Sequence, residues 1–242
     1  MPFRTVASCL VAAACAVAGP GCIEASQKPL DYEAVAVTRG NGTAVSGKWT
    51  ITMTRAEVAL GPFYFCAASS GSSTLCESSV AEVASVTFVD ALSSARSPIG
   101  KVHGFSGPIR SVSYDFGISW LETQTEATPA PPLPRGHSMR LEGFARRDLT
   151  EISFVADIDL VPQYQGQNAV STAPATADVQ SERTRLEVVL EPAAWFTQVD
   201  FDALEAARKT SVVISPGTAE HGAILVGVKN LAPLELRWVS GP

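Results

Sequence analysis

Alternation of apolar and polar residues with a period of two is the feature that most constrains the fold of this chain. Because successive side chains of a β-strand point to opposite faces of a sheet, such alternation predicts a strand with one buried face and one face toward solvent. The clearest case lies between residues 111 and 120, where small or polar residues separate the apolar positions Val112, Tyr114, Phe116, Ile118 and Trp120. This segment favours a sheet over a helix.

Further alternating segments predict an all-β fold. Residues 49–60 alternate but change phase near Arg55, which predicts a β-bulge. The other predicted strands cover residues 83–89, 139–144, 152–160, 186–190, 223–228 and 234–238. Roughly eight strands separated by turn residues predict a single antiparallel β-sandwich domain, with a closed barrel as the second choice.

Helical signals are sparse, so the sandwich is expected to carry one or two short helices. The best helix covers residues 202–208, where Asp202 and Glu205 have the spacing of a capping box. A second short helical turn is expected near residues 89–94.

Two long loops interrupt the predicted strands. Residues 123–135 contain four prolines, and residues 163–182 are rich in Gln, Ser, Thr and Ala. We expect the first loop to be extended and the second to be mobile. We expect both to be solvated insertions, with a functional role as the alternative, since long loops on a rigid sandwich often carry function.

The N-terminal segment has the composition of an export signal. Arg4 supplies a positive charge, and the uncharged apolar run over residues 5–18 is too short to span a bilayer. Two cleavage sites compete after it. Cleavage before Cys22 would give a lipoprotein, whereas cleavage after Ala18 would release a soluble exported protein.

The distribution of the five cysteines favours the lipidated form. Once the signal is removed, Cys22, Cys66 and Cys76 remain. Cys66 and Cys76 are predicted to close a short loop through a disulfide in an oxidising compartment, with a metal or redox pair as the alternative. Cys22 would then carry an unpaired thiol, and attachment of a lipid to that thiol would leave no free cysteine. We therefore predict a lipid anchor at Cys22 that holds the protein to a bacterial membrane.

The predicted organisation is a signal peptide over residues 1–21, a lipidated N-terminus and tether over 22–46, and the β-sandwich over 47–242. A first strand near residues 32–37 is the alternative inside the tether. The net charge of −6 argues against nucleic acid as a partner. A protein of the cell envelope is the expected kind of partner.

Three histidines are candidate metal ligands. His103, His137 and His221 each stand beside a glycine and at the edge of a predicted strand or loop. Imidazoles gathered at one end of a sandwich can bind copper or zinc, and Met139 would add a soft ligand. Three separate surface histidines are the favoured interpretation, and the metal site is the alternative.

Signals for catalysis are weak. The sequence has no G-x-S-x-G, H-E-x-x-H, P-loop or G-x-G-x-x-G motif. The pair Asp157 and Asp159 is expected to face water, and Asp200 with Asp202 is expected to start a helix. No catalytic residue is therefore predicted.

The four tryptophans are expected to pack rather than to bind sugars. Trp49, Trp120 and Trp238 are in phase with apolar neighbours, which predicts core positions, and Trp195 is expected to cap the sandwich.

Parts of the chain resemble known bacterial proteins. Residues 56–66, 107–120 and 195–204 resemble a family of uncharacterised bacterial lipoproteins with one β-sandwich domain. A fainter likeness is to the periplasmic copper-binding partners of methanobactin and di-haem systems. The positions that carry this likeness are Gly107, Tyr114, Gly117, Trp195, Val199 and Asp200. The resemblance implies a periplasmic or surface binding protein and names no ligand.

These observations predict an exported cell-envelope lipoprotein that acts as a non-enzymatic binding or interaction module without a cofactor. The alternative is a periplasmic copper- or zinc-binding protein that uses His103, His137 and His221.

Overall fold

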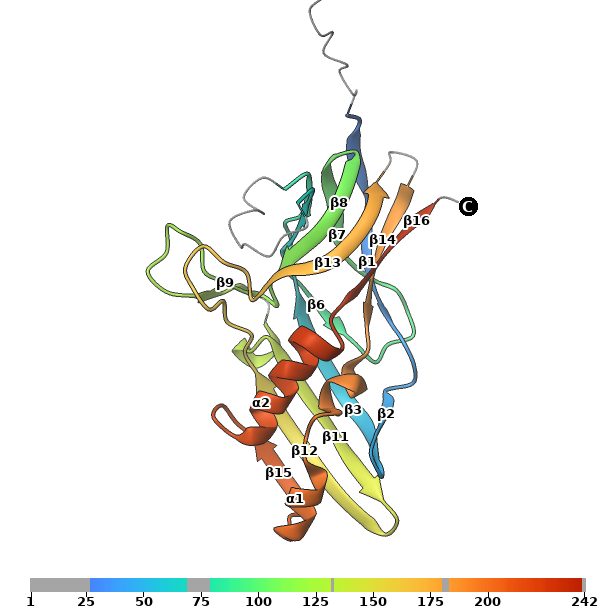
Figure 1. Cartoon of the computed structure of the whole chain (residues 1–242), viewed down its shortest axis with the longest axis vertical. Coiled ribbons are helices and arrows are strands. Elements are labelled where there is room, and N and C mark those ends of the chain that lie inside the picture. The colour runs from blue at the N-terminus through green and yellow to red at the C-terminus, as the bar shows by residue number, and fades with distance from the viewer. Residues whose placement is uncertain (1–26, 69–78, 132, 180–182, 241–242) are drawn as a thin grey trace, which may run out of the picture.

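Two β-sheets form most of the computed structural model, which describes residues 27–68, 79–131, 133–179 and 183–240 (Figure 1). The larger sheet has eight strands in the order β13-β8-β4-β5-β7-β1-β14-β16 and occupies the upper half of the view. Its strands are β1 Pro29–Thr38, β4 Phe63–Cys66, β5 Ala81–Val83, β7 Ser97–Phe105, β8 Gly107–Tyr114, β13 Val170–Val179, β14 Arg183–Leu190 and β16 Glu235–Ser240.

The smaller sheet has the order β15-β12-β11-β3-β2, with β6 paired to β3, and occupies the lower half of the view. Its strands are β2 Thr43–Ser46, β3 Trp49–Leu60, β6 Thr87–Asp90, β11 Met139–Arg147, β12 Thr150–Ile158 and β15 Ser211–Ile214. A separate ribbon pairs β9 Ile118–Ser119 with β10 Thr128–Pro129. Strand pairs are antiparallel except β1 with β14 and β12 with β15, which are parallel.

Short helices cover one face of the smaller sheet, in front of β11 and β12 in Figure 1. They are the 3₁₀-helix η3 Pro192–Phe196, the α-helices α1 Phe201–Ala206 and α2 Ala219–Val226, and the π-helical turn η4 Gly227–Leu231. A further 3₁₀-helix, η2 Pro134–Gly136, precedes β11. Buried side chains from both sheets and from these helices form one hydrophobic core. The predicted all-β, sandwich-like fold with one or two short α-helices is confirmed.

The predicted tether over residues 22–46 is too long. β1 pairs with β7 on one side and with β14 on the other, so residues from Pro29 onward belong to the fold. The reason is that Leu30, Tyr32 and Ala34 alternate and are buried, a pattern that the glycines further along obscured. Residues 1–26, which include the predicted signal and Cys22, lie outside the described residues.

Two other segments differ in type from the sequence-based prediction. Residues 223–228 form the end of α2 and the start of η4 rather than a strand, because Thr218 caps a helix there by accepting from the backbone N–H of His221 at 3.2 Å. Residues 170–179, predicted to lie in a mobile loop, form β13 at the edge of the larger sheet. Small residues at the edge of a sheet need little core contact, so the apolar pattern there was weak.

The phase change in residues 49–60 is a β-bulge, as predicted. Glu142 of β11 faces Arg55 of β3, whereas the next residue, Gly143, faces Met53, so Thr54 is the extra residue. The bulge lets β3 bury alternate residues at both of its ends despite the change of phase.

The helix predicted over residues 202–208 is confirmed as α1, but its cap is different. Asp200, and not Asp202, accepts the backbone N–H of Ala203 at 2.9 Å. Asp202 instead accepts a hydrogen bond from the indole N–H of Trp49 at 3.0 Å and pairs with Arg147. The Arg147 guanidinium also lies 4.7 Å from the Trp49 ring centroid, so these contacts bind α1 to the small sheet.

Aromatic packing holds the helical layer on the smaller sheet. Phe154 of β12 stacks on Phe196 of η3 with ring centroids 4.3 Å apart, and Phe201 of α1 packs against Trp49 at 5.7 Å. Trp195 is fully buried, as expected of a capping residue, and donates its indole N–H to the carbonyl of Ala232 at 3.1 Å. No helix in the described parts of the chain has the length and apolar character to cross a membrane.

A substitution at Gly227 tests how closely the helical layer is packed. A Cβ atom at this position would overlap with the backbone carbonyl of Trp195, so we expect Gly227→Ala to destabilise the protein by about 1–3 kcal/mol. Gly222→Ala is the matched control, because its Cβ would meet nothing within 4 Å and alanine favours α2 by up to about 1 kcal/mol. Urea denaturation of the two variants measures both effects. Equal stability of the two variants would contradict this account of the packing.

Candidate functional site

The three histidines do not form one site. His103 lies exposed on β7 in the larger sheet, opposite Asp31 of β1 and Glu82 of β5. His137 and His221 lie beside the smaller sheet, after η2 and in α2. Among the described residues, no group of three or more His, Cys, Asp or Glu side chains is arranged to hold a metal ion.

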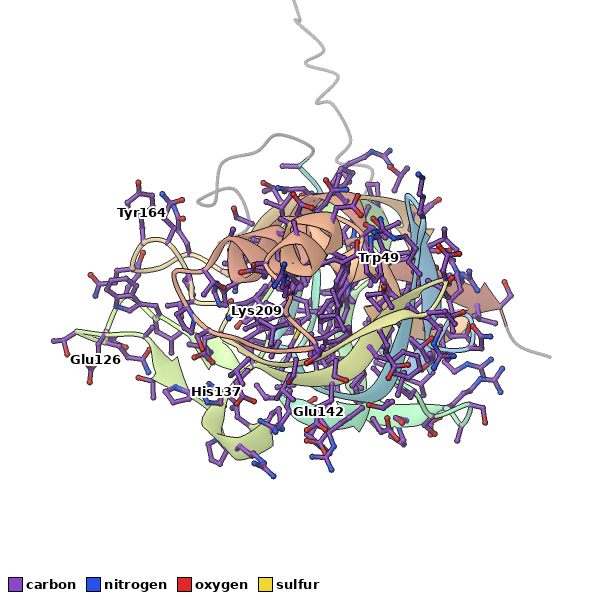
Figure 2. All side chains as sticks on the ribbon, turned by 90° about the horizontal axis from the view of Figure 1, so that it is seen from below. Trp49, Glu126, His137, Glu142, Tyr164 and Lys209 are labelled. Atoms are coloured by element: carbon purple, nitrogen blue, oxygen red, sulfur yellow. The ribbon has the colours of Figure 1, made fainter. Side chains whose placement is uncertain are left out.

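His137 and His221 are related through Asp159. Nδ1 of His137, labelled in Figure 2, lies 3.1 Å from an Asp159 carboxylate oxygen, and that carboxylate also accepts the backbone N–H of Ser138 at 3.2 Å. His221 is buried, and its Nε2 has no hydrogen-bond partner among the described residues. Burial lowers the pKa of His221, and the Asp159 charge opposes this change. This arrangement fits a structural junction between β12 and the helical layer.

Of the predicted disulfide, only one cysteine can be placed. Cys66 ends β4 and is buried, whereas Cys76 lies outside the described residues, so the pairing stays a prediction.

The most distinctive polar group is Asp115, which interrupts the strand predicted over residues 111–120. β8 ends at Tyr114 and β9 begins at Ile118, with an isolated β-bridge between Phe116 and Gly61 in the gap. Between them the Asp115 backbone N–H donates to the Pro62 carbonyl and its carbonyl accepts from Gly61 N–H, each at 3.0 Å. Asp115 is only 1% exposed, which is unusual for a carboxylate without a cation in direct contact.

Three donors hold the Asp115 carboxylate. It accepts the hydroxyl of Ser119 at 3.0 Å, the side-chain amide of Asn168 at 3.0 Å and the backbone N–H of Ala169 at 2.6 Å. Both of its oxygens are therefore engaged. Because Ser119 lies in β9 and Asn168 in the loop that precedes β13, this carboxylate joins the loop around β9 to the loop that precedes β13.

Further hydrogen bonds join the same two loops. Gly166 donates its backbone N–H to the carbonyl of Trp120 at 2.7 Å, and Gln165 donates to the carbonyls of Glu122 and Gln124. Gly166 has φ +77°, a left-handed conformation that favours glycine. In Figure 1 the loop around β9 and the loop that precedes β13 extend together from one side of the molecule, and Figure 2 shows Tyr164 and Glu126 at its outer edge.

A pocket of about 490 Å³ lies where these loops meet the larger sheet. Its floor is formed by side chains of β4 and β5, and its walls by the two loops. The lining residues are Tyr64, Ser79, Glu82, Asp115, Ser119, Trp120, Leu121, Glu122, Gly166, Gln167 and Asn168. A concave pocket in which polar groups converge beside aromatic rings is a candidate site for a small molecule.

The pocket is electrostatically negative. Burial raises the pKa of Asp115 to about 6, although its three hydrogen bonds and the charge of Lys229 oppose the change. Burial, followed by the charges of Asp115 and Glu82, raises the pKa of Tyr64. Burial lowers the pKa of Lys229, with Asp115 opposing. These groups therefore interact closely although they come from four separate segments.

Sequence reasoning missed this site for identifiable reasons. Trp120 was expected in the core because it continues the apolar phase, but it is only partly buried and lines the pocket. Asp115 was placed on a solvent-facing strand surface. The signal that could have revealed the site was the length of the loop over residues 163–182, because Gly166, Gln167 and Asn168 belong to it.

Comparisons with known proteins give little similarity. No family model matches the chain, and no curated protein matches it. Among solved structures, MbnP from Methylosinus trichosporium is similar, with 10% sequence identity, a TM-score of 0.38 and coverage of 82% of this chain and 87% of that chain. The candidate site is therefore described from this chain's own residues and not from those of a related protein.

The raised pKa of Asp115 predicts a specific pH dependence of stability. Its pKa is about 6 in the folded protein and 3.8 as a model carboxyl, so the folded state binds the proton more tightly. The resulting stabilisation is present below pH 4 and is lost as the pH rises through about 6, by roughly 3 kcal/mol in total. Relative to the wild type, Asp115→Asn should therefore gain about 2.4 kcal/mol of stability between pH 4 and pH 7, because the wild type carries most of this stabilisation at pH 4 and almost none at pH 7.

Urea denaturation of both proteins at several pH values between 4 and 7 measures this difference. Asp148→Asn is the control, because Asp148 is exposed in the turn between β11 and β12. It should follow the wild type at every pH. If the difference in unfolding free energy between Asp115→Asn and the wild type were the same at every pH, burial would not shift the pKa of the Asp115 carboxyl.

Proposed function

We propose that this chain is an exported, non-enzymatic binding protein of the bacterial cell envelope, and that the pocket beside Asp115 is its ligand site. The observation that carries the proposal is the pocket itself. Its volume of about 490 Å³ lies in the range of small-molecule sites, which is roughly 300–1,000 Å³. Its walls are held in place by hydrogen bonds rather than left to close around the ligand.

The support for pre-organisation comes from the loops. The Asp115 carboxylate and the Gly166–Trp120 backbone bond fix the two loops against each other. The indole N–H of Trp120 donates to the carbonyl of Gln124 at 3.2 Å, which fixes the ring. A pocket whose walls are already ordered loses less conformational entropy when a ligand binds.

Binding is favoured over catalysis because of how Asp115 is used. A carboxyl with a raised pKa in a pocket is also typical of a general acid. Here, however, Ser119, Asn168 and Ala169 occupy both carboxylate oxygens. The carboxylate is thus committed to the scaffold, and we assign Asp115 a positioning role.

A screen of small molecules by thermal unfolding tests the pocket. Sugars, amino acids, amines and carboxylates are each added to the purified protein. A ligand at 100 times its Kd stabilises by about 2.7 kcal/mol and should raise Tm by several degrees. Trp120→Leu should abolish the rise, whereas Trp238→Phe, a change in β16 outside the pocket, should retain it. No rise with any class, or equal rises in both variants, would refute the site.

The envelope location rests on the predicted lipid anchor at Cys22. Because β1 begins at Pro29, only six residues would lie between the anchor and the sheet, which are seven Cα–Cα steps apart. An extended chain of this length reaches roughly 25 Å, so the folded part would lie close to the membrane surface.

The anchor predicts the fractionation of cysteine variants in the native bacterial host. The wild-type protein should be recovered with membranes, and Cys22→Ala should move to the soluble fraction. Cys15→Ala should stay with membranes, because Cys15 lies in the predicted signal. Fractionation followed by immunoblotting measures the distribution. Recovery of Cys22→Ala with the membranes would exclude Cys22 as the anchor.

A further inference from the structure

The charged side chains that line the pocket are all of one sign. Three carboxylate side chains line it, from Glu82, Asp115 and Glu122, and none of its lining residues is Lys, Arg or His. Lys229 interacts with Asp115 but does not line the pocket. An occupant with a positive charge would therefore neutralise groups that otherwise repel one another.

Strand register explains why Tyr64 and Glu82 lie together. Tyr64 of β4 is directly opposite Glu82 of β5 on one side and Ser113 of β8 on the other. Cross-strand partners share a face of the sheet, so the phenol and the carboxylate project from the floor side by side. Their charge interaction, which raises the pKa of Tyr64, agrees with this placement.

Aromatic rings supply the other recognition element. Tyr64 and Trp120 both line the pocket, and the Trp120 ring is fixed through its indole N–H. The faces of Trp and Tyr rings attract cations, and the attraction is strongest where the cation is partly desolvated. Carboxylates next to such rings are suited to an ammonium or guanidinium group that carries carbon substituents.

The pocket is less suited to other occupants. An anion would face three carboxylates. A bare metal ion needs ligands a few ångströms apart, and the described residues include no such group. A neutral sugar could stack on Trp120, but it would leave the carboxylates uncompensated. We propose that the ligand is an organic cation, bound with its charge against Glu82 and Glu122 and its carbon substituents against Trp120 and Tyr64.

This inference rests on the proposed function, because it assigns a ligand class to the same pocket. Choline is the main probe, since its charge does not change with pH, and 3,3-dimethyl-1-butanol is its neutral isostere. Arginine and spermidine extend the test to other cation shapes, and cellobiose and acetate represent neutral sugars and anions. Isothermal titration calorimetry of the purified protein at pH 7 measures each Kd.

We expect at least one of the three cations to bind. If choline binds, it should bind at least ten-fold more tightly than its neutral isostere. Glu82→Gln and Glu122→Gln should each weaken binding of the cation several-fold. Glu33→Gln is the matched control, because Glu33 lies exposed on β1 of the same sheet and does not line the pocket. It should leave the Kd unchanged.

Several results would overturn the inference. Equal affinity for choline and its isostere, or equal loss in all three glutamate variants, would refute the role of charge. Binding of cellobiose or acetate that is lost in Trp120→Leu, without binding of any cation, would refute the ligand class and leave the proposed site standing. If nothing binds and the thermal screen is also negative, both the ligand class and the proposed function fail.

Discussion

The buried carboxylate of Asp115 is the interaction on which the candidate site depends. It ends β8, joins the β9 loop to the loop that precedes β13, and contributes to the charge of the pocket. Removing a carboxylate from water is costly unless hydrogen bonds replace its hydration. Its three donors meet that requirement, and burial nevertheless holds its pKa near 6. The three hydrogen bonds that stabilise the buried charge therefore also hold the two loops that form the walls of the pocket.

The two sheets have different tasks in this protein. The smaller sheet packs its aromatic face against η3 and α1, through Phe154, Phe196 and Phe201, and forms a rigid base. The larger sheet has its polar face beside the two loops. Both sheets contribute to the hydrophobic core, and the long loops stand beside the larger sheet. This arrangement fits a binding module, in which a stable scaffold supports a site made of loop residues.

The fold was predictable where side-chain alternation is strong. β3 with its bulge at Thr54, β11, β12 and β14 all follow from period-two patterns, because each buries one face. Prediction failed for β1 and β13 and for residues 223–228. β13 is rich in small residues, glycines close to β1 hid its pattern, and residues 223–228 are apolar in a way that suits a strand or a helix. In each case a contact with a distant segment decides the outcome.

The sequence by itself determined the fold class, most of the strands and the low charge content, since these depend on residue type and local spacing. It also predicted an export signal and an anchor at Cys22. Only the tertiary structure decided that Asp115 is buried, that Trp120 leaves the core, and that His103 lies on a different sheet from His137 and His221. These outcomes depend on which strands pair and which loops meet, and that information is long-range. A pocket formed by β4, β5 and two loops has no local signature, because its residues are neighbours only in space.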